Sequence, residues 1–514
     1  MRRRVSQLLR IRDRPPPTPP PQTEPWYRPS NADMHWCLRL PETLGLIFDF
    51  VEDRDTLLSL ARVCTQFVVM ATDRLPQHLS NIYELLMALP HDLWELKVLR
   101  DKSVNKRWDY LLPWVITFVR EVTPEEWKIL LVKTARVKTI GVRSNRLDYP
   151  SNTTSTDHDT QDPRVFRGRI LEPDTTVVEA LSKCPADILF PNLRCLRGQI
   201  PGSLIPKVLS PSLRHLQICT LEAGRGDIWY NRIPTAAECC PELRSFVVVW
   251  DNDYLLIDSV ADRCRLVPHF VSQWDHLQSY TGPADEQILY HFSRLPELES
   301  LAVWLDLERS VRPAGATTGN RLRKLRSLRC LTSSLEHIVK ALEILFGTEA
   351  PPTSQYTRPA LQRFCAQGFH LRESVSATVS AIANYVALDA LESFRVLNHT
   401  CPLFADTASV YELLRPLSMF PSLTDVYFPY VTHHPVSYGR LTAPQLLDLA
   451  RAWPNLRELE VAHPGVEFTV LEVAALRRYC PQLQRVPSAS IRTDKHDLAA
   501  IAADPGVLER AGLA

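Results

Sequence analysis

The sequence predicts an α/β protein in which a small N-terminal helical domain precedes a curved solenoid of repeats, with parallel strands inside and helices outside. Three observations support this prediction. An apolar stretch with helical periodicity covers residues 38–67. A short phrase containing proline and leucine recurs from about residue 190 to residue 486. Capped helices precede copies of that phrase, so helix and strand alternate along the chain.

The composition of the 514-residue chain allows several domains or one elongated repeat array. The formal net charge is +1, from 59 basic and 58 acidic residues. This balance gives no electrostatic reason to expect nucleic acid or an anionic membrane as a partner. Hydrophobic residues make up 45% of the chain, but no run of 18 apolar residues predicts a transmembrane helix. We expect a protein of the cytoplasm, the nucleus or both.

Residues 1–33 are basic at the start and then rich in proline. The proline run over 15–25 predicts an extended, polyproline-like segment. A mitochondrial address fits poorly, because Asp13 and the prolines interrupt it. We expect a disordered tail, and binding of this tail to a proline-recognising domain is the alternative.

Two or three helices are predicted over residues 41–67. Pro41 suits the first position of a helix, and Glu42 lies in its first turn. About 40 residues supply too little core to fold robustly alone, so the excess of apolar side chains predicts a partner protein. The apolar face of the first helix contains Leu44, Ile47, Phe48 and Val51, and that of the following segment contains Leu57, Leu60, Ala61, Cys64 and Phe67.

One phrase, Pro-x-Leu-x-x-Leu-x-apolar, recurs along the body of the chain. Clear copies are "SPSLRHLQI" at 210–218, "CPELRSFVV" at 240–248 and "WPNLRELEV" at 453–461. The spacing of the anchoring leucines lies around and above the period of leucine-rich repeats. Because one unit cannot bury its apolar faces alone, stacked units predict a parallel sheet covered by helices. The anchors are Leu193, Leu213, Leu243, Leu277, Leu298, Leu325, Leu361, Leu391, Leu423, Leu456 and Leu483.

Each unit is predicted to contain a capped helix, a turn and a short strand. The spacing of Thr123 and Glu126 predicts a capping box, and Thr469 with Glu472 repeats it. The helix that begins after Thr469 should end near Cys480, because a residue before proline avoids the helical region. Residues directly before proline should fill the layer between helix and strand: Cys240, Leu295, Phe420, Trp453 and Cys480.

The stretch over residues 38–78 resembles an F-box. It has a Leu-Pro opening, an Ile-Phe pair, an apolar second helix, a Val-Cys pair and a following aromatic residue. The recurring phrase is similar to the degenerate leucine-rich repeats of fungal F-box proteins. The resemblance implies that the F-box docks on a Skp-type adaptor, while the repeats hold a target protein for a cullin-based ubiquitin ligase. The adaptor-facing residues would be Leu40, Pro41, Leu44, Ile47, Phe48, Leu57, Ala61, Val63, Cys64 and Phe67.

The sequence contains no phosphate-binding glycine loop, nucleophile elbow or zinc-protease motif. Its 12 cysteines form no CxxC pair, so we expect reduced, mostly buried thiols. The adjacent pairs at 239–240 and 433–434 lack the spacing of metal ligands. Because the resemblance implies a recognition subunit that performs no chemistry itself, we expect no enzyme, no catalytic residue, no metal and no cofactor.

Two interpretations of the function remain open. The first is a substrate-recognition subunit of the ligase, and the second is a leucine-rich-repeat interaction scaffold with a vestigial F-box. Thr43 stands where the family usually has leucine and Pro76 where it commonly has tryptophan, and both favour the second. Target binding is expected on the concave strand face or its loops, where aromatic residues are the favoured anchors. The candidates are Trp250, Trp304, Tyr427 and Tyr430.

The expected domain order follows from these features. A polar stretch near 144–163 is expected to be a mobile insert between repeats. The predicted segments are the tail (1–33), the F-box (34–78), a helical connector (79–122), the solenoid (123–490) and a C-terminal helical cap or tail (491–514).

Overall fold

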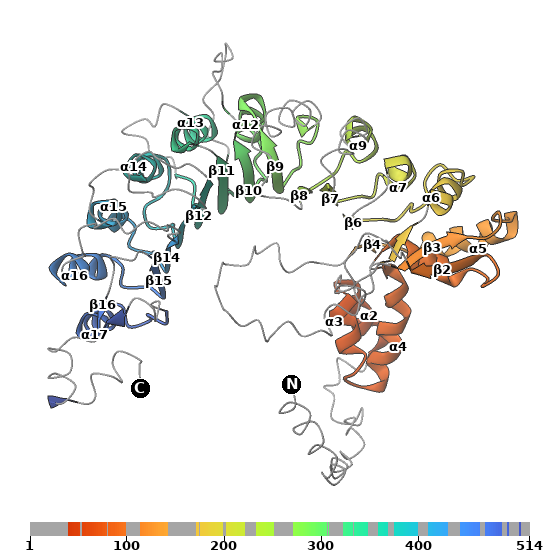
Figure 1. Ribbon diagram of the computed structural model, residues 1–514, viewed down its shortest axis with the longest axis horizontal. Helices are drawn as coiled ribbons and strands as arrows, with labels where there is room; N and C mark the ends of the chain where they lie inside the picture. The colour runs from red at the N-terminus through yellow and green to blue at the C-terminus, as the bar shows by residue number, and fades with distance from the viewer. Residues whose placement is uncertain are drawn as a thin grey trace, which may run out of the picture.

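An arch of strands with helices along its outer side forms the body of the protein in this computed structural model (Figure 1). The predicted tail at 1–33, the polar insert at 144–163 and nearly all of 491–514 lie outside the residues that the structure describes. Those described are 40–51, 54–79, 81–98, 114–141, 171–173, 175–198, 202–220, 233–250, 271–305, 307, 322–332, 334–347, 358–368, 375–398, 410–429, 443–462, 468–485, 491–492 and 503–504.

A twelve-stranded sheet lines the inside of the arch, and its pairings are parallel. The strands lie side by side in chain order, so the predicted α/β solenoid arrangement is confirmed. They are β1 (His78–Leu79), β4 (Thr139–Ile140), β6 (Cys195–Gly198), β7 (His215–Thr220), β8 (Ser245–Trp250), β9 (Ser279–Ala284), β10 (Ser300–Leu305), β11 (Ser327–Thr332), β12 (Arg363–Gly368), β13 (Ser393–Asn398), β14 (Asp425–Pro429) and β15 (Glu458–Ala462).

Helices between the strands form the outer layer of the arch (Figure 1). Parallel neighbours need such crossovers, because a hairpin turn cannot join them. A short separate sheet pairs β16 (Phe468–Thr469) with β17 (Ile491–Arg492). The outer helices are α5 (Pro124–Thr134), α6 (Thr175–Ser182), η9 (Gly202–Leu204), α7 (Ile205–Val208), α9 (Ile233–Cys239), α12 (Glu286–Phe292), α13 (Leu335–Phe346), α14 (Val375–Tyr385), α15 (Val410–Leu414), η10 (Arg415–Met419), α16 (Ala443–Ala452) and α17 (Val470–Tyr479).

Both capping boxes predicted from the sequence are present. In α5, the Thr123 side chain accepts from the backbone N–H of Glu126, whose carboxylate accepts from the Thr123 N–H. Thr469 and Glu472 make the same pair of contacts at the start of α17. That helix ends at Tyr479, one residue before the C-cap Cys480, as the following proline predicts.

The repeat leucines and the residues before proline fill one continuous core between the helices and the sheet. All eleven anchoring leucines are at most 4% exposed, and the five residues predicted to fill the layer are at most 3% exposed. Two buried indoles also hydrogen-bond the preceding repeat. The Trp274 Nε1 donates to the Cys240 carbonyl and the Trp453 Nε1 to the Leu417 carbonyl, each at 3.0 Å. These contacts join successive repeats as well as the two layers.

A ladder of backbone hydrogen bonds aligns the starts of the strands. The Arg194 carbonyl accepts from two amides of the next repeat, those of Arg214 at 2.8 Å and His215 at 3.0 Å. The same pattern recurs as far as the Arg457 carbonyl, which accepts from Gln484 at 2.8 Å and Arg485 at 3.0 Å. Equivalent residues of successive repeats therefore lie side by side on the sheet.

The helical connector expected over 79–122 requires correction. Its described residues form a 3-10 helix, η5 (Ile82–Ala88), and two antiparallel strands, β2 (Trp94–Val98) and β3 (Trp114–Phe118). A third strand, β5 (Leu171–Pro173), joins them in parallel. The β-branched run over 115–117 favours a strand, and Ile116 within it is fully buried. The predicted start of the solenoid at 123 is also too late, because β1 already pairs with β4.

Three short helices stand at the N-terminal end of the arch, near β2, β3 and β4 (Figure 1). They are α2 (Pro41–Asp49), α3 (Arg54–Leu60) and α4 (Thr65–Arg74), and η4 (Leu75–Gln77) continues from them into β1. The predicted second helical segment is divided into α3 and α4. Between Ser59 and Val63 the backbone hydrogen bonds join residues three apart instead of four, and the backbone of Cys64 is then extended. The helices enclose a small core of Leu44, Phe48, Leu57 and Ala71.

Candidate functional site

The first candidate surface lies on α2–α4 and is rich in exposed apolar side chains. Of the thirteen large apolar residues exposed in the described part of the chain, seven fall between positions 40 and 69. Phe50 is 85% exposed and Val69 67%. Single exposed apolar residues are common, but seven of them within thirty positions make this part of the chain a candidate interaction surface. We call this set the N-terminal apolar surface: Leu40, Leu46, Ile47, Phe50, Leu58, Val63 and Val69.

The structure divides the predicted adaptor-facing residues between surface and core. Leu40, Pro41, Ile47 and Val63 are exposed. Ala61 and Phe67 are half-buried, and Leu44, Phe48, Leu57 and Cys64 are buried.

The four buried positions therefore need correction, because they stabilise the three helices rather than present a surface. Phe48 is 1% exposed and meets Phe67 edge to face, with ring centroids 5.3 Å apart. Four exposed residues on or beside the same helices were not identified from the sequence. Phe50, for example, falls outside the predicted apolar face of the first helix. The missed residues are Leu46, Phe50, Leu58 and Val69.

The second candidate surface is the inner, concave face of the sheet. Alternate residues along each strand point to opposite sides. In β10, Leu301, Val303 and Leu305 belong to the core, whereas Ser300 and the residues two and four positions later are half-buried on the other side. The parallel register then places equivalent inner-face residues of neighbouring strands next to one another.

Polar side chains gather on the inner face of β13, β14 and β15. Arg395 donates through Nε to Asp425 Oδ2 at 2.5 Å, and the Ser393 hydroxyl donates to the same oxygen at 2.8 Å. The Arg395 guanidinium also lies 5.8 Å from the centre of the Tyr427 ring. Tyr427 pairs in register with Arg395 on one side and with Glu460 on the other. We call Arg395, Asp425, Tyr427 and Glu460 the concave-face cluster.

The concave-face cluster is unusually buried for a polar surface. Asp425 is 9% exposed and Tyr427 5%. Burial, together with the charge of Glu460, raises the pKa of Tyr427 to about 12. Burial also raises the pKa of Glu460; the charge of Arg485 opposes this effect, and the nearby carboxylate of Glu458 adds to it. In the described part of the chain, Asp425 Oδ1 and the Tyr427 hydroxyl have no hydrogen-bond partner. Both atoms are themselves shielded from solvent, and unpaired polar atoms in such a position require an explanation.

The structure does not bring the four predicted target-binding residues together. Tyr427 belongs to the concave-face cluster. Trp304 is half-buried on the same face but in β10, four strands away, which is about 19 Å at the usual strand spacing. Tyr430 and the side chain of Trp250, the last residue of β8, lie outside the described residues. Arg395, Asp425 and Glu460 were not identified from the sequence. Their common position on the inner face of neighbouring strands is visible only when the repeats are aligned strand by strand.

A hollow of about 440 Å³ lies where β12–β15 begin. It is lined by residues directly before these strands, among them Glu392, Thr424 and Arg457. The Thr424 hydroxyl donates to the Glu392 carbonyl at 3.0 Å, and Arg457 Nε donates to Gln482 Oε1 at 3.0 Å. Thr424, which lines the hollow, directly precedes Asp425 in the chain, although no residue of the concave-face cluster lines the hollow itself.

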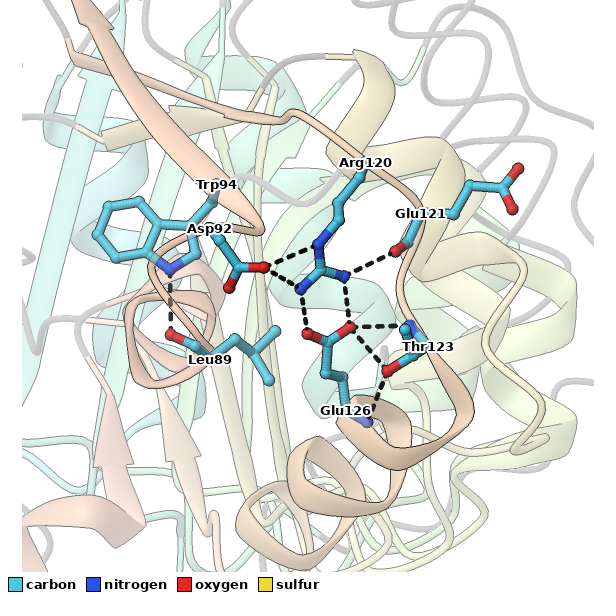
Figure 2. Close-up of polar contacts among 7 residues, drawn as sticks. All are labelled: Leu89, Asp92, Trp94, Arg120, Glu121, Thr123 and Glu126. Carbon is cyan, nitrogen blue, oxygen red and sulfur yellow. Dashed lines mark hydrogen bonds and ion pairs between the residues drawn. The ribbon is translucent and has the colours of Figure 1, made fainter.

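A third polar cluster, around Arg120, joins the β2–β3 hairpin to α5 (Figure 2). Arg120 donates to Asp92 Oδ2 at 2.8 Å, to Glu126 Oε1 at 2.6 Å and to the Glu121 carbonyl at 3.1 Å. Glu126 also accepts from the Thr123 N–H at 2.8 Å. The hydrogen bond from Arg120 is the largest cause that lowers the pKa of Glu126 to about 2. Because its charges already satisfy one another, we interpret this cluster as structural.

The described cysteines are free thiols, and six of the eight are buried. Burial raises the pKa of Cys240 to about 12 and that of Cys480 to about 11. Within the described ranges, no three or more His, Cys, Asp or Glu side chains are grouped to hold a metal ion. Among the helices described, none has the length and apolar character needed to cross a membrane.

Comparison with known proteins assigns no family: the chain matches no family model and no curated protein. The two surfaces described above are therefore the basis for proposing a function.

Proposed function

We propose that this protein is a substrate-recognition subunit of a Skp–cullin–F-box ubiquitin ligase. In this proposal α2–α4 dock on a Skp-type adaptor, which connects them to a cullin, and the solenoid holds a target protein. The observation that carries the proposal is the N-terminal apolar surface, because the three short helices and the residues directly beside them expose seven large apolar side chains at one end of the arch. Such a subunit acts in the cytoplasm or the nucleus.

The small core of α2–α4 supports the need for a partner. Four fully buried apolar residues hold these helices together, whereas seven face outward. Ile47 belongs to the Ile-Phe pair that resembles an F-box and is 42% exposed. Protein interfaces depend on a few such apolar anchors, each of which contributes about 2 kcal/mol or more. An adaptor that covers Ile47 and Phe50 would remove this apolar surface from water.

The role proposed for the chain requires no chemistry of its own. Holding a target on the arch while the adaptor binds α2–α4 raises the effective concentration of target lysines near a ubiquitin-charged enzyme. The continuous core from β1 to α17 suits this task, because a rigid spacer keeps the two bound proteins at a fixed separation.

Co-purification with a recombinant Skp-type adaptor tests the proposal. Ile47→Asp should abolish binding, because a charge would be buried at the centre of the interface. Val132→Asp is the matched control, since Val132 is 69% exposed on α5 and lies outside the N-terminal apolar surface. Failure of the wild-type chain to bind the adaptor, or binding that survives Ile47→Asp and Phe50→Asp, would overturn the proposal. Thermal unfolding confirms that the variants remain folded.

The alternative function is a repeat scaffold whose F-box is vestigial and which works outside a ligase. Thr43 and Pro76 favour it, because both depart from the F-box pattern. Pro76 lies in η4, the turn that leads directly into β1, so its backbone serves the junction with the solenoid. This alternative expects bound partner proteins, but neither adaptor nor cullin, when the wild-type chain is purified from cells.

A further inference from the structure

The concave-face cluster leaves specific acceptor capacity unused. Asp425 Oδ2 is occupied by Arg395 and Ser393, but Oδ1 of the same carboxylate has no partner in the described part of the chain. The hydroxyl of Tyr427 lacks one as well. Both residues are more than nine-tenths buried, so leaving these atoms unpaired is costly unless a ligand supplies the missing bonds.

The charges around these atoms are unequally compensated. Asp425 is paired with Arg395, and Glu458 lies 3.8 Å from Arg485. Glu460 forms no ion pair within the described ranges, although it is half-buried beside the other two carboxylates. The three carboxylates Asp425, Glu458 and Glu460 therefore share Arg395 and Arg485, whose charges both act on Glu460, and one oxygen of Asp425 has no donor in the described part of the chain.

Strand geometry places these acceptors within reach of a single cationic group. Tyr427 and Glu460 are direct partners across β14 and β15, so their Cα atoms are about 5 Å apart. Asp425 lies two residues before Tyr427 on the same face, about 7 Å away along the strand. An ammonium or guanidinium group carries several N–H donors, so one such group can serve acceptors on neighbouring side chains.

We propose that the concave-face cluster binds a lysine or arginine side chain of the target protein. The cation would donate to Asp425 Oδ1 and to the Glu460 carboxylate and lie against Tyr427, as Arg395 already does from the other side. The neighbouring hollow at the starts of β12–β15 would receive an adjacent part of the same segment. This inference rests on the proposed function as a target receptor and specifies the chemistry of that target.

Binding of the purified full-length chain to a peptide library tests the proposal. The probe is a set of immobilised dodecapeptides, each with one fixed central residue and randomised flanks. The wild type should prefer central lysine or arginine over central glutamate by about tenfold, the effect of one charge-assisted hydrogen bond. Glu460→Lys should reverse this preference towards acidic residues.

Two milder variants separate binding from folding. Glu460→Gln removes a half-buried carboxylate that forms no ion pair in the described part of the chain, and Tyr427→Phe removes a hydroxyl without a described partner, so neither should lower the thermal midpoint. Both should nevertheless reduce the basic preference, Glu460→Gln by about tenfold and Tyr427→Phe by about threefold. Glu297→Gln is the matched control, because it removes the same charge from an exposed pair with Lys324 in the turns before β10 and β11 and should leave the preference intact.

Two results would overturn the inference. One is a wild-type chain that selects no basic residue, as expected if water molecules alone satisfy the cluster. The other is a basic preference that persists at full strength in both Glu460→Gln and Tyr427→Phe. No adaptor is present in this measurement, so its failure leaves the adaptor proposal to be decided separately by co-purification.

Discussion

Replacing Glu126 by glutamine should weaken the junction between the β2–β3 hairpin and α5. The Glu126 side chain is 7% exposed and accepts from Arg120 at 2.6 Å and 2.9 Å (Figure 2). Its pKa lies near 2, against 4.5 for an ordinary glutamate, and a difference of that size corresponds to about 3 kcal/mol. Arg120 is 34% exposed, so solvent screens the pair. We therefore expect a loss of about 1–2 kcal/mol for Glu126→Gln at pH 7.

The sign of the pH dependence follows from the lowered pKa. A carboxylate that holds its proton less tightly in the folded state stabilises that state above the pKa of the unfolded chain, 4.5. The stabilisation is lost as the pH falls from 4.5 towards 2. The difference in stability between wild type and Glu126→Gln should therefore be full at pH 7, about two-fifths of that value at pH 3 and almost absent at pH 1.

Hydrogen exchange of the α5 amides is the appropriate assay, because stacked repeats need not unfold in one step. The variant should exchange faster than the wild type at pH 7, by roughly five- to thirtyfold. Glu472→Gln is the control, since Glu472 sits in an equivalent capping box without an arginine partner in the described part of the chain. Equal effects of the two substitutions, or an effect of Glu126→Gln that does not shrink at pH 3, would refute the reasoning.

Three further predictions concern the core. Trp453→Ala should cost about 3–5 kcal/mol through a cavity and an orphaned carbonyl, seen as a lower thermal midpoint; the half-buried Trp304→Ala should cost clearly less. Phe48→Ala should expose α2–α4 to limited proteolysis, whereas Phe50→Ala, at a position 85% exposed, should not, and equal cleavage would contradict the placement. Three buried thiols should resist iodoacetamide at pH 8 in the folded chain, because burial raises their pKa: Cys240, Cys330 and Cys480. Labelling of these thiols in the folded chain, detected by mass spectrometry, would contradict this prediction.

Much of the solenoid could be predicted because each repeat carries its own signals. The capping pairs at Thr123 and Thr469 act within one turn of helix, and the proline after Cys480 ends a helix locally. All the anchoring leucines are buried, because each has the same position within its repeat whatever the length of the loop between repeats. These features require only neighbours in the chain.

The connector and the N-terminal helices show where local patterns fall short. The strands β2 and β3 stabilise each other by pairing, although residues 99–113 separate them in the chain. A prediction from local sequence patterns does not detect such a pairing. On α2, Ile47 and Phe48 are adjacent, yet one is 42% exposed and the other 1%. Which of the two is buried depends on where α3 and α4 pack.

The sequence by itself determined the repeat, the helix caps, the alternation of strand and helix, and the residues that fill the core. All of these depend on contacts within one repeat or on a regular period. Only the tertiary structure decided the two candidate sites. Arg395, Asp425 and Glu460 lie more than 29 residues apart in sequence, and the parallel register of three strands brings them together. The packing of three helices likewise decides which apolar residues remain exposed, because burial is a property of the assembled fold.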